Sequence, residues 1–249
     1  MAAISDDMRL TFRRQGYLVV PGVLDQRQIA FGRRAVRAVL AKWPPADGHS
    51  GPHSVFRRFG EEGHPLLDFY RETGVEALAG QLLRRGLGMQ DPEHVQVATT
   101  IPPWPHRPGG PHVDGLTPTE PDGRPGTFTV LAGVWLTDHT APDRGNLWMW
   151  PRTHLRFGQY LAERGADALT RIDEMAPGPY PRIELGDPVQ ALGPAGSVLF
   201  AHYLLAHNIG NHTGSSADER RETLYYRLLA EGHRKRWREA VADPLAEFS

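Results

Sequence analysis

The second half of the chain carries the pattern that most restricts its fold. From about residue 94, short apolar runs rich in β-branched and aromatic residues alternate with segments that contain Gly, Pro, Asn and Asp. The runs are HVQVATTI, TFTVLAGVWLTDH, NLWMWP, GSVLFAHYLLAHN and ETLYYRLLAE. Short strands separated by turn residues are typical of an all-β barrel or a double-sheet jelly roll. The sequence therefore predicts a mainly β protein with flanking helices, whose core has roughly eight strands.

The first part of the chain has a different pattern. Residues 16–24 (GYLVVPGVL) predict a short strand and a turn, after which Asp25 is expected to cap a helix with one apolar side. Residues 43–64 contain several prolines and glycines and predict a loop. Residues 65–86 have helical periodicity. The order of elements is therefore helices first and the β-core afterwards.

The length of the chain fits a single domain. We expect one domain over residues 1–249, in which a mostly helical part, residues 1–90, packs on a β-core, residues 91–235. Residues 115–126 and 156–190 are long, polar stretches with Pro and Gly. Loops of that length in a compact domain are often functional, so these two and the 43–64 loop are expected to form the lid and to decide specificity.

Composition narrows the chemistry that is available. The chain has no cysteine, which excludes disulfides, thiolate metal sites and cysteine nucleophiles, so any metal must be held by His, Asp or Glu. The formal net charge of -1 gives no indication of a nucleic-acid partner, and the basic run HRKRW at 233–237 predicts a solvated helix face. No signal-peptide pattern or membrane-length apolar run is present, so a soluble cytoplasmic protein is expected. The sequence does not indicate an oligomeric state.

The motif HVD at 112–114 is a candidate for part of a metal site. If it lies at the end of a strand, the two-residue period places His112 and Asp114 on the same face and Val113 on the other. An imidazole and a carboxylate suit Fe(II), Mn(II) or Zn(II). Two ligands are too few, so a third is expected from a distant strand.

Four downstream histidines compete for that third position. His154 is expected in a turn and His212 on the surface, whereas His202 and His207 are an odd number of residues apart and should face opposite sides of an extended stretch. A strand that ends at His207 would direct its imidazole into the mouth of the barrel. The pattern therefore favours His207, with His202 second.

A strand over the last apolar run would carry a row of polar side chains. Arg221, Thr223, Tyr225 and Arg227 share one face of it. An arginine inside a barrel is costly unless it meets a carboxylate, which it could hold in a bidentate fork. Two histidines, one carboxylate and an interior arginine fit the facial-triad site of non-haem Fe(II) oxygenases.

With these motifs, the sequence resembles the phytanoyl-CoA dioxygenase family of Fe(II)/2-oxoglutarate-dependent oxygenases. The resemblance covers most of the chain and implies a double-stranded β-helix (jelly-roll, cupin-like) core. It is carried by FRRQGYLVVPGVLDQRQI, PHVDG, GVWLTDHTAPDRGNLWMWPRTHL, GPAGSVLFAHYLLAHNIGNHT and RRETLYYRL.

The resemblance implies roles for individual residues. His112, Asp114 and His207 match the iron ligands, and Arg221 matches the arginine that pairs with the distal carboxylate of 2-oxoglutarate. Trp135 matches a residue that lines the cosubstrate pocket.

Gln96 is a weaker match to a polar cosubstrate contact. The segment between the distal histidine and the arginine is longer than usual, which leaves Arg220 and Arg227 as alternatives to Arg221. Ile209 stands where many relatives have a small polar residue. Because Asp114 is intact, halogenation is not expected.

The function implied is hydroxylation of an unactivated C–H bond in a small-molecule metabolite, such as a natural-product intermediate, with Fe(II), 2-oxoglutarate and O2 and with release of succinate and CO2. One alternative is desaturation, cyclisation or epimerisation at the same metal centre. Another is a cupin-like metal isomerase or a small-molecule binder, and a zinc hydrolase is less favoured because no general base is evident. The substrate cannot be identified from the sequence.

Overall fold

The computed structural model describes residues 2–60, 64–106, 110–115, 120–174 and 180–248, with the side chains of 171–174 left aside. The helices are α1 (Asp6–Gln15), α2 (Gln26–Lys42), α3 (Pro65–Glu72), α4 (Val75–Leu82), α5 (Thr153–Arg164) and α6 (His233–Ala242), with two 3-10 helices, η1 (Ala166–Glu174) and η2 (Ala217–Glu219). The strands are β1 (Tyr17–Val20), β2 (Gly51–Arg58), β3 (His94–Ile101), β4 (Val130–Trp135), β5 (Leu147–Met149), β6 (Val189–Gln190), β7 (Val198–His202), β8 (His207–Ile209) and β9 (Arg221–Leu228).

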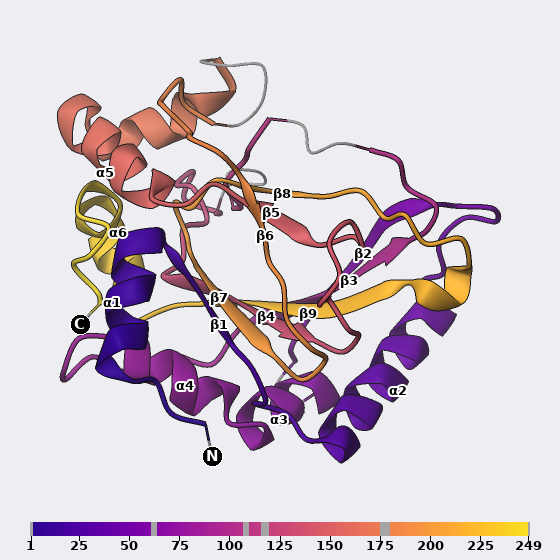
Figure 1. The fold of residues 1–249 in the computed structure, drawn as a ribbon. Coiled ribbons are helices and arrows are strands. Elements are labelled where there is room, and N and C mark those ends of the chain that lie inside the picture. Colours follow the sequence, from indigo (N-terminus) through magenta and orange to yellow (C-terminus); the bar gives the residue numbers. More distant parts are fainter. Residues whose placement is uncertain (1, 61–63, 107–109, 116–119, 175–179, 249) are drawn as a thin grey trace.

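Two antiparallel sheets form the core. The larger has the order β1-β7-β4-β9-β3-β2 and the smaller the order β6-β5-β8. The smaller sheet lies over one face of the larger, α2, α3 and α4 lie against the other face, and α1 stands at one end of the sheet (Figure 1). The predicted fold class, a β-core with flanking helices, is confirmed.

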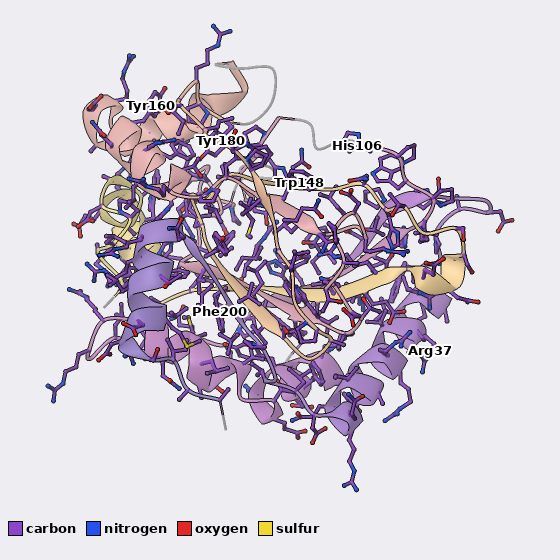
Figure 2. The ribbon with its side chains drawn as sticks, in the orientation of Figure 1. Arg37, His106, Trp148, Tyr160, Tyr180 and Phe200 are labelled. Atoms are coloured by element: carbon purple, nitrogen blue, oxygen red, sulfur yellow. The ribbon has the colours of Figure 1, made fainter. Side chains whose placement is uncertain are left out.

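The alternation of side chains along the strands divides the interior into two apolar clusters. On β7, Val198 and Phe200 join the cluster beneath the sheet with the N-terminal helices, whereas Leu199 and Ala201 join the cluster between the two sheets. In Figure 2, Phe200 lies on the helical side of the large sheet, and Trp148 of β5 lies on the opposite side. A strand that is apolar on both faces is expected when both faces are covered.

Local sequence explains where the first helices begin and end. The side chain of Asp25 accepts from the backbone of Gln28, and the side chain of Gln28 accepts from the backbone of Asp25, which is a capping box. Helix α1 ends at Gly16, whose φ of 83° is readily adopted only by glycine. The predicted strand at 16–24 and the cap at Asp25 are confirmed.

The prediction of a loop at residues 43–64 was wrong for its central part. Residues 51–58 form β2, which pairs with β3 from Gly51↔Ile101 to Arg58↔His94. Strand β2 is an edge strand, where a proline is tolerated because one row of N–H groups is not needed for the ladder. The N-terminal part therefore contributes both edge strands of the large sheet, β1 and β2, in addition to helices.

Three other predictions need correction. The stretch 156–190 is largely helical, because α5 and η1 occupy its first half. The helix predicted over 65–86 is two helices, α3 and α4, separated at Gly74, which has a φ of 77°. The basic run at 233–237 lies on α6, but His233 and Trp237 at its two ends are buried, so only its middle is solvated.

In the part of the chain that the structure describes, every helix is too short or too polar to cross a membrane.

Candidate functional site

The HVD motif lies against the start of β8. The backbone N–H of His112 donates to the carbonyl of His207 at 3.1 Å, and the N–H of His207 donates back to His112 at 3.3 Å. These two bonds form an isolated antiparallel bridge. The centroids of the two imidazole rings are 4.5 Å apart. Residues 112–114 do not form the strand end that the sequence pattern assumed. The bridge nevertheless places both polar residues of the motif on the ligand group. It brings His112 and Asp114 to the distal histidine.

His112, Asp114 and His207 form a compact group of metal-ligand types. Their candidate ligand atoms lie within 4.8 Å of one another. Oδ1 of Asp114 is 3.7 Å from Nε2 of His112 and 3.8 Å from Nε2 of His207. Two imidazoles and one carboxylate fit Fe(II) with coordination positions left open.

The tautomer of His207 is favourable for metal binding. Its Nδ1–H donates to the carbonyl of Leu205 at 2.9 Å. Nε2, which lies 3.8 Å from Oδ1 of Asp114, is therefore the ring atom left for a metal, which is the usual arrangement of a ligating histidine.

Burial and mutual charge set the protonation of the three side chains. Burial, followed by the neighbouring His207, lowers the pKa of His112 to about 4, so this ring is neutral at ordinary pH. Burial alone would lower the pKa of His207, but the Asp114 carboxylate reverses this and raises it. Burial alone would raise the pKa of Asp114, but His207, Arg227 and His112 hold it well below its usual value. The site therefore presents a carboxylate to a cation.

The other histidines point elsewhere. Both ring nitrogens of His202 are bonded, to the Pro244 carbonyl and to the Leu204 N–H, because the chain turns after β7 before β8 begins. The extended stretch that was predicted through His207 is therefore broken, although His202 and His207 do face different sites. His154 lies in α5 and not in a turn, and its ring donates to the carbonyl of Arg13.

His212 is buried, with 1% of its surface exposed, so the expectation that it lies on the surface was wrong. Its Nε2 donates to the Glu219 carbonyl, and its Nδ1 accepts from the Gly214 N–H.

A cavity of about 200 Å³ adjoins the group of three ligand candidates. Arg221 lines it and is only 2% exposed. One of its Nη atoms donates to the hydroxyl of Tyr225, and its Nε has no partner among the residues that the structure describes. Within the described residues, no carboxylate is within ion-pair distance of this guanidinium. A buried cation without a counter-charge is costly, so the cavity is suited to an anionic ligand.

The other two arginines proposed as anchors are already paired. Arg220 lies outside the cavity lining, and its Nε donates to Glu222 at 2.8 Å. Nη2 of Arg227 lies 3.4 Å from Oδ2 of Asp114. Of the three, Arg221 is the one whose charge is unmatched in the described structure.

Several buried polar atoms near Arg221 also lack a partner. They include Nε1 of Trp135, Oγ1 of Thr223 and Oγ1 of Thr100. These residues are close together because Trp135 pairs with Thr223, and Thr100 pairs with Arg221, across neighbouring strands. Unsatisfied buried polar groups are rare in native proteins and often mark a missing ligand.

Gln96 lines the cavity, and its amide donates to Ser54 of β2 at 3.0 Å. Ser54 was missed, because β2 had been predicted as loop. The sequence pattern had placed Thr223 and Tyr225 on the inner face without assigning them a role. His106 stacks near Trp104 at 5.4 Å, and its neighbour Arg107 lies outside the described residues.

The loop that follows Asp114 is closed at its base. The N–H of Gly126 donates to the carbonyl of Gly115 at 2.7 Å. This contact holds the two ends of the 115–126 segment together beside the ligand group, while residues 116–119 are outside the described part.

Comparison with known proteins supports the resemblance found in the sequence. A family model described as phytanoyl-CoA dioxygenase matches residues 12–221. No curated protein sequence matches the chain.

Solved structures share the fold. Two come from nogalamycin biosynthesis and are each 21% identical to this chain, the non-haem α-ketoglutarate-dependent epimerase SnoN and carbocyclase SnoK. SnoN matches with a TM-score of 0.57 over 90% of this chain and 81% of its own, and SnoK with 0.58 over 93% and 90%. HygX from Streptomyces hygroscopicus, with nickel and 2-oxoglutarate bound, is 16% identical with a TM-score of 0.56 over 91% and 87%. These identities support the fold and not a particular reaction.

Proposed function

Because the chain belongs to the phytanoyl-CoA dioxygenase family, it is an iron- and 2-oxoglutarate-dependent oxygenase, and we propose that His112, Asp114 and His207 hold its Fe(II). The observation that carries this assignment is the closeness of their ligand atoms, all within 4.8 Å of one another. The hydrogen bond from His207 to Leu205 and the ionised Asp114 support it further. Three protein ligands leave half of an octahedral coordination sphere for cosubstrate and O2.

Arg221 binds the distal carboxylate of 2-oxoglutarate. Its guanidinium is buried, has no counter-charge among the described residues, and lines the same cavity as the ligand group. The hydroxyl of Tyr225 orients it, and Thr223 and Trp135 supply further buried donors that lack partners in the described structure. A carboxylate at this position satisfies a charge and several hydrogen-bond donors together.

The protein's own part in the reaction is binding, orientation and exclusion of water. Iron held by the three ligand candidates would, with 2-oxoglutarate and O2, supply the oxidising power for a substrate C–H bond. Apolar residues of β4 and β5, Leu131 and Leu147, line the cavity with the polar groups. Gln96 of β3 borders the same cavity from the large sheet. It is a further cosubstrate contact, weaker than Arg221. The whole chain, residues 1–249, serves as one catalytic domain in this proposal.

The substrate is a small-molecule metabolite, and hydroxylation is the principal reaction we propose. Epimerisation and cyclisation at the same centre are the second candidates, since the structural relatives SnoN and SnoK are named as an epimerase and a carbocyclase of nogalamycin biosynthesis. HygX has been solved with the small molecule hygromycin B bound. A natural-product intermediate is therefore the substrate class to be examined first.

The test is formation of succinate from 2-oxoglutarate. The purified protein with Fe(II), 2-oxoglutarate and O2 is expected to release succinate slowly without substrate, and Asp114→Ala is expected to abolish the release. Arg238→Met, which removes a surface arginine paired with Asp167 and outside the cavity lining, serves as the control. A wild-type protein that binds metal but forms no succinate under any condition would instead support a metal isomerase or a binding protein.

A further inference from the structure

The two carboxylate oxygens of Asp114 face different partners. Oδ1 lies between the Nε2 atoms of His112 and His207, at 3.7 and 3.8 Å. Oδ2 lies 3.4 Å from Nη2 of Arg227. The side chain of Asp114 is 17% exposed and that of Arg227 is 22% exposed, so this is a largely buried pair and not a solvated one.

Aromatic rings hold the guanidinium of Arg227 in place. Its Cζ lies over the ring of Phe56 and over the ring of Phe128, 5.7 Å from each centroid. Phe128 is buried and packs edge-on against Tyr203, whereas Phe56 comes from the edge strand β2 and is exposed. A flat guanidinium between aromatic neighbours loses little further freedom when it pairs with a carboxylate.

We propose that Arg227 is a positioning residue for the metal centre, which holds Oδ2 of Asp114 so that Oδ1 alone is presented to the iron. The proposal rests on the metal site of the proposed function. A carboxylate that binds through one oxygen takes one coordination position and not two. Arg227 thereby keeps open a position that 2-oxoglutarate or O2 requires.

An effect of charge alone and an effect of positioning would change the metal affinity of an Arg227 variant in opposite directions. A nearby cation repels a divalent metal ion, so removal of Arg227 should strengthen metal binding if the arginine did nothing more. Removal of a positioning group should weaken binding, by about 10- to 100-fold for groups that orient metal ligands. It should also change the geometry of the bound metal, because both oxygens of Asp114 would become available.

The experiment uses Co(II), whose visible absorption reports the number and arrangement of its ligands, added to the full chain without iron or 2-oxoglutarate. Arg227→Met removes the charge and keeps an apolar side chain between the rings. Arg227→Gln is measured in its place if the methionine variant does not melt cooperatively. Arg238→Met is the matched control, because Arg238 also pairs with a carboxylate, Asp167, and lies over an aromatic ring, that of Trp237, but is neither a ligand candidate nor part of the cavity lining.

We expect the Co(II) spectrum of Arg227→Met to differ from that of the wild type, with an affinity lowered about 10- to 100-fold. Arg227→Lys, which restores the charge without the flat fork, should recover part of the spectrum, and Arg238→Met should match the wild type. A spectrum of Arg227→Met that superimposes on the wild type overturns the proposal, whatever the affinity. If the wild type itself gives no Co(II) spectrum, or if Asp114→Ala leaves it intact, the metal site itself is refuted.

Discussion

At the scale of single residues, the unmatched charge of Arg221 is the feature that most clearly calls for a ligand. A neutral replacement would relieve the cost of the buried cation and remove the partner of a carboxylate. We therefore expect Arg221→Gln to fold and to raise the 2-oxoglutarate concentration for half-maximal succinate formation by about 10- to 100-fold. The metal affinity should change little. An unchanged 2-oxoglutarate requirement would indicate that Arg220 or Arg227, and not Arg221, binds the distal carboxylate.

The indole of Trp135, on the strand next to that of Arg221, allows a finer test of the proposed cosubstrate contacts. Trp135 is 1% exposed, its Nε1 has no partner in the described part of the chain, and its ring stacks on His139 at a centroid distance of 4.6 Å. Trp135→Phe keeps an aromatic ring and removes the donor. We expect the half-saturating 2-oxoglutarate concentration to rise about 2- to 10-fold, because the variant loses one hydrogen bond to the cosubstrate. Trp237→Phe on α6 is the control, and equal values for both variants would leave Trp135 with a packing role only.

At the scale of elements, the fold class and the division into an early helical part and a later β-core were predictable because they depend on local periodicity. Strand β2 was not, since Gly51 and Pro52 at its start are typical of loops and its pairing with β3 is a long-range contact. His212 was assigned to the surface because it follows turn-like residues, but it forms a strand-like bridge with Trp104 and is buried. Single-sequence patterns contain no information on such tertiary contacts.

The candidate ligands illustrate the same limit. The two-residue spacing of His112 and Asp114 was predicted to act through a strand, and His207 was expected at a strand end. In the structure the bridge between His112 and His207 and the turn that separates β7 from β8 produce the grouping. The motif and the family resemblance selected these residues, whereas their actual geometry comes from the pairing of distant segments.

The base of the 115–126 loop gives a prediction at this scale. Gly115 has a φ of 78°, and a Cβ there would collide with the backbone oxygen of Gly126. Gly123 has a similar φ of 81° but nothing within 4 Å. We expect Gly123→Ala to cost about 1 kcal/mol for the backbone conformation alone. Gly115→Ala should cost more, about 2–4 kcal/mol in total, and should weaken metal binding, because Asp114 is its neighbour.

Urea unfolding and metal titration of both alanine variants test this. Equal stability losses for the two variants would show that the contact between Gly115 and Gly126 does not restrict the loop.

At the scale of the whole molecule, a buried polar cluster attaches the C-terminal segment to the β-core. Oε2 of Glu247 accepts from Nδ1 of His233 at 2.8 Å and from the hydroxyl of Thr129 at 2.7 Å. Burial alone would raise the pKa of Glu247, but His233, Thr129 and Arg236 outweigh it and lower the pKa below its usual value. The cluster joins α6, the end of the chain and the start of β4.

The sign of its pH dependence follows from that lowered pKa. A carboxylate with a lower pKa in the folded state stabilises the fold fully above its unfolded pKa, about 4.3, and loses this contribution as the pH falls through the folded value. We expect Glu247→Gln to be less stable than the wild type by about 1–3 kcal/mol near pH 7. The difference should shrink as the pH is lowered from about 5 to 3. A difference that is constant over this range in thermal or urea unfolding would contradict the account.

The grouping of His112, Asp114 and His207 beside Arg221 is the central claim, and one spectrum tests it most directly. Anaerobic addition of Fe(II) and 2-oxoglutarate to the wild-type protein should produce a visible metal-to-ligand charge-transfer band, which forms when the cosubstrate chelates the iron. His207→Ala should abolish the band, and His106→Ala, a histidine outside the proposed ligand group, should retain it. A wild-type protein without the band, or a His207→Ala variant that keeps it at full strength, would contradict the account.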